Sequence, residues 1–159
     1  MSRINKGQKF YGNIVDILNQ QFKASTAQGK SLIGWYKSAW PQGKPFLVNK
    51  HDVRREEAVV WFPSVTDDPR SNVAGDWLTV VSAGGDIITT TYVGRLTFQE
   101  TFEKVSRFIG KNHIVFARRA GQRNPFEFLG VYTSERRDDT FVYRRFAEFI
   151  EPNAWNRWW

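Results

Sequence analysis

The sequence contains no cysteine and only two histidines. Without cysteine the chain cannot form disulfides, use a thiolate nucleophile or bind zinc through sulfur. This absence fits a reducing cytoplasm, which is the expected location. Apolar runs are also short: none follows the N-terminus, and none approaches the roughly 20 residues of a membrane span. We therefore expect neither a signal peptide nor a membrane partner.

The local motifs of common enzymes are missing as well. There is no nucleophile elbow, no phosphate-cradling glycine loop and no strand with the acidic-x-Lys step of metal-dependent nucleases. His113 opens an apolar strand and is expected to be structural, and His51 lies in a charged run that indicates solvated surface. We predict no catalytic residue, no metal site and no cofactor. A metal-dependent nuclease that uses His51 with Asp and Glu side chains is kept as an alternative.

Positive charge and aromatic rings are the two excesses. The formal net charge is +7, and aromatic residues make up 16% of the chain, including seven Trp and thirteen Phe. An excess of positive charge favours a polyanionic partner, most often nucleic acid, whereas large rings are typical fillers of a β-rich core. The length of 159 residues suits one domain. We predict a single globular domain over residues 1–153 and a Trp-rich tail over 154–159.

Two helices and a series of short strands are predicted from periodicity. Apolar spacing indicates a helix over 13–22, capped by Asn13, and a second over 97–110, which begins in a Thr-x-x-Glu capping box. β-type runs cover 32–36, 46–49, 58–62, 77–82, 87–93, 113–118, 126–132 and 141–146, with a glycine turn at 83–86. The expected class is α+β: a strongly bent antiparallel sheet or small β-barrel with two or three helices.

Basic residues concentrate in the second half of the chain. Residues 103–145 carry ten Lys or Arg and five Asp or Glu, so this segment holds +5 of the net +7. Arginine presents a planar fork that matches phosphates and guanine edges. The predicted contacts to DNA or RNA are Arg118, Arg119, Arg123, Arg136, Arg137 and Arg144, with Lys44 from a loop.

Tryptophans outside the predicted strands are the candidate contact aromatics. Trp40 precedes a proline in a loop, so it is hard to bury and is available to stack on an unpaired base. Trp155, Trp158 and Trp159 stand at i, i+3 and i+4, which puts their rings on one side of a short helix. We expect the three rings to dock on the domain itself or on a protein partner.

A segment of the second half resembles a known hairpin. Residues 113–132 combine an apolar-Phe-x-Arg strand, a polar loop and a Phe-x-Phe-Leu-Gly strand, followed by Val-Tyr-Arg-Arg at 142–145. The pattern is similar to small barrel domains attached to bacterial restriction and helicase-type proteins, some of which are grouped with PUA-like barrels that read modified or unusual bases. The resemblance covers about a fifth of the chain. It implies a barrel fold and a base pocket.

The leading hypothesis is a non-enzymatic nucleic-acid-binding module. An Arg-rich face would neutralise phosphates, and a loop aromatic would stack on an unusual or unstacked base. The alternative from another class is a small interaction or inhibitor protein, for example phage-encoded, that acts on a nucleic-acid-handling enzyme. Binding to heparin and DNA over a salt series, with and without magnesium, separates these two hypotheses from the nuclease.

Overall fold

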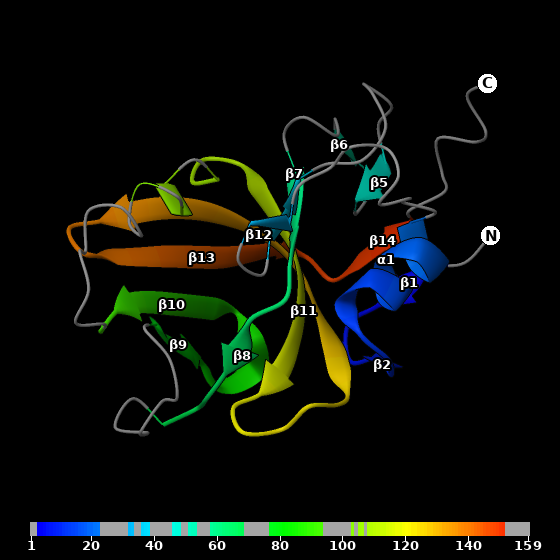
Figure 1. Cartoon of the computed structure of the whole chain (residues 1–159). Coiled ribbons are helices and arrows are strands. Elements are labelled where there is room, and N and C mark those ends of the chain that lie inside the picture. The colour runs from blue at the N-terminus through cyan, green and yellow to red at the C-terminus, as the bar shows by residue number, and fades with distance from the viewer. Residues whose placement is uncertain are drawn as a thin grey trace.

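The computed structural model describes residues 3–22, 32–33, 36–38, 46–48, 51–53, 58–68, 77–93, 103, 105–106 and 108–151 (Figure 1). Three long strands form its centre: β11 (Asn112–Arg119), β12 (Phe126–Arg137) and β13 (Thr140–Ala147). They pair antiparallel in chain order, because Gly121 and Asp138 adopt the positive φ values that tight turns need. This meander is the segment whose sequence is richest in alternating aromatic and β-branched residues.

The central meander is extended on both sides. On one side β13 pairs with β10 (Ile87–Tyr92), which pairs with β9 (Trp77–Val81) across the 3-10 turn Ala83–Gly85. On the other side β11 pairs in parallel with β7 (Ala58–Trp61), followed by β4 (Tyr36–Ser38) and β3 (Leu32–Ile33). The sheet is therefore mixed rather than purely antiparallel.

The sheet curls into a half-barrel, and a short strand bridges two of its parts. β8 (Ser64–Val65) runs parallel to the end of β11, and Thr66 forms a parallel bridge with Val80 of β9. The backbone bonds Thr66 N–H to Thr79 O (3.0 Å) and Val81 N–H to Thr66 O (2.9 Å) complete this bridge. In Figure 1, β8 lies between β9 and β11 at the lower end of the curl.

A smaller sheet lies beside the curled one. It contains, in order, β1 (Ile4–Asn5), β14 (Phe149–Glu151), β5 (Phe46–Val48) and β6 (His51–Val53), while β2 (Lys9–Phe10) pairs with the start of β12. Helix α1 (Ile14–Phe22) follows β2, and the Asn13 side chain accepts a hydrogen bond from the Asp16 N–H at 2.9 Å. The predicted cap of this helix is confirmed.

The curled sheet buries a different cluster on each face. Cluster one lies under α1 and the N-terminal strands and consists of Ile4, Phe10, Ile14, Ile17, Val60, Phe62, Ile114, Phe116, Phe126, Phe128, Val131, Ala147 and Ile150. Cluster two fills the inside of the curl and consists of Val59, Trp61, Val65, Ile88, Phe108, Val115, Ala117, Tyr132, Phe141 and Tyr143. Strand alternation sends neighbouring residues of β11 to opposite clusters, which fixes the register of the sheet.

Gly130 marks a bulge where β12 bends. Its φ is +126°, and a Cβ at this position would lie 2.5 Å from the carbonyl oxygen of Ala147 and 2.7 Å from Cδ of Arg145. Only glycine fits such a close approach of β13. The pairing of β12 with β13 shifts register next to it, at Val131/Tyr132. Before the bulge the side chains alternate regularly, and Phe126 and Phe128 both face cluster one.

The predicted fold class is wrong. β-strands dominate the described residues and form a curled half-barrel, so the architecture is mostly β and not α+β with two or three helices. In the described part of the chain α1, nine residues long, is the longest helix, and its Ile14 and Ile17 pack in cluster one. Of the helix predicted over 97–110, Glu103, Val105 and Ser106 are helical, and Phe108–Gly110 form a turn; its capping box lies outside the described residues. Strands β1, β2, β6, β8 and β14 were not predicted.

No helix in the described segments is long and apolar enough to cross a membrane.

Candidate nucleic-acid interface

A pocket of about 320 Å³ opens at the end of the curl where β8 bridges β9 and β11. Its floor is apolar, built from Val65, Val81, Ala117 and Leu129 on the cluster-two face, with Pro125 beside them. Its polar lining consists of Lys9, Thr66, Asp67, Arg118, Arg119, Gln122 and Glu127. An apolar floor with a few convergent polar groups is the usual composition of a small-ligand site.

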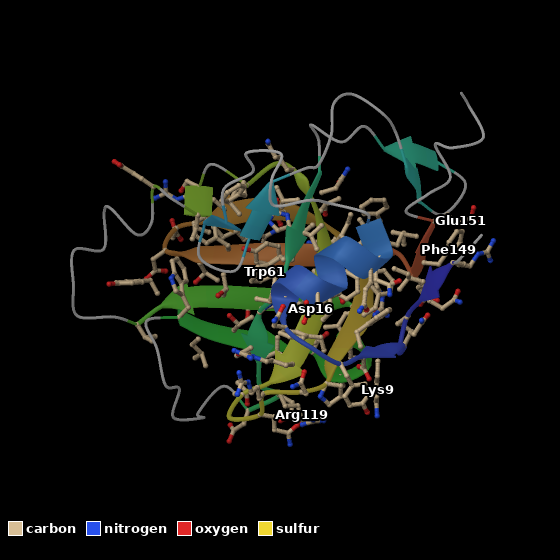
Figure 2. The ribbon with its side chains drawn as sticks, turned by 45° about the vertical axis from the view of Figure 1, so that its right-hand side comes forward. Lys9, Asp16, Trp61, Arg119, Phe149 and Glu151 are labelled. Carbon is tan, nitrogen blue, oxygen red and sulfur yellow. The ribbon has the colours of Figure 1, made fainter. Side chains whose placement is uncertain are left out.

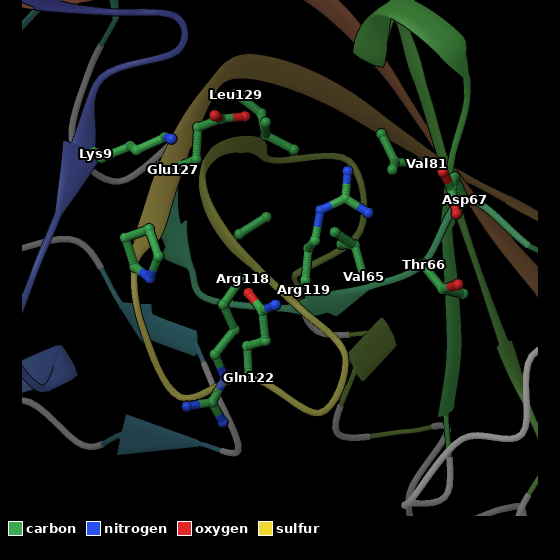
Figure 3. A pocket seen from close by; sticks show the side chains of 12 residues that line it. Lys9, Val65, Thr66, Asp67, Val81, Arg118, Arg119, Gln122, Glu127 and Leu129 are labelled. Carbon is green, nitrogen blue, oxygen red and sulfur yellow. The ribbon is translucent and has the colours of Figure 1, made fainter.

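The two adjacent arginines serve this pocket differently. Arg118 is held in place: its Nε–H donates to Ser64 Oγ at 3.2 Å, its guanidinium lies 5.3 Å from the Phe126 ring centroid, and its Nη1–H reaches the Arg123 carbonyl at 3.5 Å. Arg119 is exposed, and its guanidinium points into the pocket toward Leu129 and Val81 (Figure 3). Figure 3 shows the two guanidinium groups pointing apart, as strand alternation requires.

Four charged side chains face the pocket without an ion pair to one another. Lys9, Asp67, Arg119 and Glu127 all line it, and none forms an ion pair within the described part of the chain. Figure 2 shows Lys9 and Arg119 at the same end of the molecule, and β2 brings Lys9 opposite Glu127 on β12. Donors and acceptors whose charges are unpaired remain available to a ligand.

The remaining predicted arginines lie at the opposite end of β12. Arg136 Nε–H donates to the Asp138 carbonyl at 2.8 Å, and Arg137 and Arg144 lie 3.4 and 3.5 Å from the same Glu135 carboxylate oxygen. Ten residues of strand separate Phe126 from Arg136, about 30 Å if fully extended. The structure therefore brings Arg118, Arg119 and Arg123 together at the pocket end and leaves Arg136, Arg137 and Arg144 at the far hairpin.

Several predicted contacts lie outside the described residues. These are Trp40, Lys44, Trp155, Trp158 and Trp159, and their roles stay predictions. Among the described residues no group of three His, Asp or Glu side chains gathers where it could hold a metal ion. His113 is fully buried, and this burial lowers the pKa of its imidazole to about 3.

Five of the seven polar residues that line the pocket were not predicted from the sequence. Lys9, Thr66, Asp67, Gln122 and Glu127 were not among the predicted contacts. For Glu127 a signal existed, since alternation already put it on the face opposite Phe126. For Thr66 and Asp67 the chain shows only an acidic, turn-rich segment, and the strand that brings them to the pocket, β8, is two residues long.

Comparison with protein families gives a match over most of the chain. Residues 11–151 match the SRA, or SET and RING associated, domain. The chain belongs to this family. A search of curated proteins found no match. SRA domains are DNA-binding modules with a PUA-like barrel fold that read a methylated cytosine flipped out of the duplex.

Membership in the SRA family confirms the coarser predictions. A nucleic-acid-binding module, DNA as the nucleic-acid partner and the PUA-like part of the resemblance are all supported. The curled sheet fits a barrel of this kind. The link to restriction or helicase-type proteins stays a prediction.

Proposed function

We propose that this SRA domain binds DNA without cleaving it and receives a flipped-out modified cytosine in the pocket between β8, β9, β11 and β12. The observation that carries the proposal is the composition of the pocket: an apolar floor under an incompletely paired set of donors and acceptors. A base needs both, because its ring is apolar and its edge is not.

The polar groups of the pocket match the pairing edge of cytosine. The exocyclic N4 amino group is a donor, and the carboxylates of Asp67 and Glu127 are acceptors. The N3 and O2 atoms of the base are acceptors, and Arg119 and Gln122 supply donors. A methyl group on C5 would find the apolar side chains of the floor, such as Val65 and Val81.

Cations around the pocket would hold the DNA backbone. Arg123 is exposed in the β11–β12 loop, next to the pocket residue Gln122, and Lys9 is exposed on β2. Phosphate contacts of this kind position the duplex and make affinity salt-dependent, while contacts inside the pocket carry the specificity. Trp40 and Lys44, from the proline-rich loop, are further proposed contacts of the same interface.

The test compares duplexes that differ in a single base. Fluorescence anisotropy should show tighter binding of a duplex with one 5-methylcytosine than of its unmodified copy. Asp67→Asn should weaken binding of the methylated duplex by about tenfold, since one polar base contact is worth about 1–3 kcal/mol. Glu135→Gln, which removes a carboxylate at the far hairpin, is the matched control and should bind the methylated duplex normally.

Two results would count against this function. Equal binding of both duplexes by the unaltered protein would exclude methylated cytosine as the ligand. Cleavage of the duplex on addition of magnesium would favour the nuclease instead.

A further inference from the structure

An exposed tyrosine follows the strand that contributes Lys9 to the pocket wall. Tyr11 is 69% exposed, more than the other exposed large hydrophobic residues in the described part of the chain, Val93 and Phe146. It follows β2, whose Lys9 lines the pocket and whose Phe10 is buried in cluster one. Tyr11 is the first residue after β2 and comes two residues after Lys9, so its backbone lies at the pocket end of the sheet.

The backbone after Tyr11 is tied to the loop that forms one rim of the pocket. The Gly12 N–H donates to Oδ1 of Asn124 at 3.3 Å, and β2 pairs with β12 through Phe10 and Phe126. Pro125, the neighbour of Asn124, lines the pocket. Tyr11 is therefore held at the rim by contacts that do not involve its ring.

The same loop carries an exposed cation. Arg123 precedes Asn124 and is exposed, and its carbonyl accepts a hydrogen bond from the guanidinium of Arg118 at 3.5 Å. Arg118 is itself anchored on Ser64, so the position of Arg123 is linked to the body of the sheet. An aromatic ring beside a cation is the combination that binds a nucleotide, by stacking on the base and by charge on the phosphate.

We propose that Tyr11 and Arg123 form a second nucleotide subsite next to the pocket. It takes the nucleotide that adjoins the flipped base on the same strand, with Tyr11 against the base and Arg123 against the phosphate. Flipping uncovers one face of the adjoining base, which gives the Tyr11 ring a surface to stack on. This inference rests on the proposed function for the location of the flipped base.

Stacking is indifferent to sequence, which separates the subsite from the pocket. Tyr11→Ala should weaken binding of the methylated duplex, in which the base is flipped, by about fivefold to 150-fold for one stacked base, whatever base adjoins the methylated cytosine. Tyr11→Phe keeps the ring and should bind within about twofold of the unaltered protein. Phe146→Ala, which removes an exposed ring that does not line the pocket, is the matched control and should bind normally.

Cross-linking locates the contact. Iododeoxyuridine placed next to the methylated cytosine should cross-link on irradiation to the tryptic peptide of residues 10–23, which contains Tyr11. Arg123→Ala should reduce the slope of log affinity against log salt by about one unit, the value for one lost phosphate contact.

The outcomes distinguish the two proposals. If the unaltered protein binds both duplexes equally and Tyr11→Ala still weakens binding, methylation is not what the pocket reads, while the contact of Tyr11 with DNA stands. If methylated DNA is preferred but Tyr11→Ala binds normally, or the cross-link maps to another peptide, the subsite is overturned and the pocket stands. If the protein binds neither duplex, both proposals fail.

Discussion

The two faces of the curled sheet bury different kinds of side chain. In cluster one, rings such as Phe62 and Phe116 stack at 5.4 Å between centroids. On the cluster-two face the buried set includes the hydroxyls of Tyr132 and Thr90 and the imidazole of His113. Each of these polar groups costs free energy unless it is hydrogen-bonded.

The pocket opens on the polar face alone. Val65 and Ala117 of cluster two line it, together with Leu129 and Val81, which pack against that cluster; no member of cluster one does. Cluster one therefore contributes to stability, whereas the cluster-two face also carries groups that line a site. Three changes test this difference, from the largest expected effect to the smallest.

Acid should destabilise the protein through His113. Its imidazole is fully buried, packs edge-on against Trp61 and Tyr143 at 5.8 and 5.0 Å, and pairs its Nδ1 with the Lys111 carbonyl at 3.0 Å. Burial disfavours the charged ring and lowers its pKa from 6.5 to about 3. Between these values the unfolded chain binds a proton that the folded chain does not, so stability falls as pH falls through this window.

The expected loss from His113 is about 4 kcal/mol between pH 7 and pH 3.5. Urea unfolding of the unaltered protein and of His113→Phe at both pH values measures it. The variant keeps an aromatic ring but cannot titrate. Between pH 7 and pH 3.5 its free energy of unfolding should therefore fall by about 4 kcal/mol less than that of the unaltered protein. An identical fall in both proteins would show that His113 is not buried as a neutral ring.

Much of the local structure could be predicted from the sequence, because it depends on neighbours in the chain. The alternation around Phe126 and Phe128, the cap at Asn13 and the close approach at Gly130 follow from periodicity and backbone geometry. The fold class could not be predicted, because β1, β8 and β14 are two or three residues long. Strands this short exist through pairing with distant segments and leave no periodic signal.

Two neighbouring arginines on β13 should differ sharply in their effect on stability. Arg145 is 6% exposed; it donates to the carbonyls of Gly84 (2.9 Å) and Leu129 (3.2 Å) and to the Asp86 carboxylate (2.7 Å). Strand alternation turns Arg144 outward, where its guanidinium lies 3.5 Å from the Glu135 carboxylate across the hairpin. Arg145 thus connects the 3-10 turn to the backbone of Leu129, a pocket residue, through hydrogen bonds from one guanidinium group.

Arg145→Met should cost about 2–3 kcal/mol, because two carbonyls and a carboxylate lose a charged donor. For a domain of this size the melting temperature should fall by about 5–10 °C. Arg144→Met, with the same change in charge and volume, should cost less than about 0.5 kcal/mol. Differential scanning calorimetry compares the two, and equal melting temperatures would contradict the buried role of Arg145.

The candidate site was only partly predictable, because charge composition says how many arginines there are but not which of them pair. The run 118–123 and the run 136–144 look alike in the sequence. Only the folded hairpin shows that Arg137 and Arg144 share the carboxylate of Glu135, while Arg119 points into a pocket. Whether an arginine is paired depends on which acidic residue lies beside it. Strand register sets those neighbours, and composition carries no information about register.

Replacing exposed cations at the two ends of β12 should have the smallest effect on stability. For these variants the informative measurement is DNA binding. Lys9→Ala with Arg123→Ala removes two positive charges at the pocket end, and Arg136→Ala with Arg137→Ala removes two at the far hairpin. Both double variants should have a free energy of unfolding within about 0.5 kcal/mol of that of the unaltered protein, because these side chains are exposed.

Anisotropy over a salt series measures DNA binding. The slope of log affinity against log salt should fall by about one to two units for the pocket-end pair only, as expected for lost phosphate contacts. Since the two double variants have the same net charge, an equal fall in both would mean that DNA senses the overall charge and that the pocket end is not the binding surface.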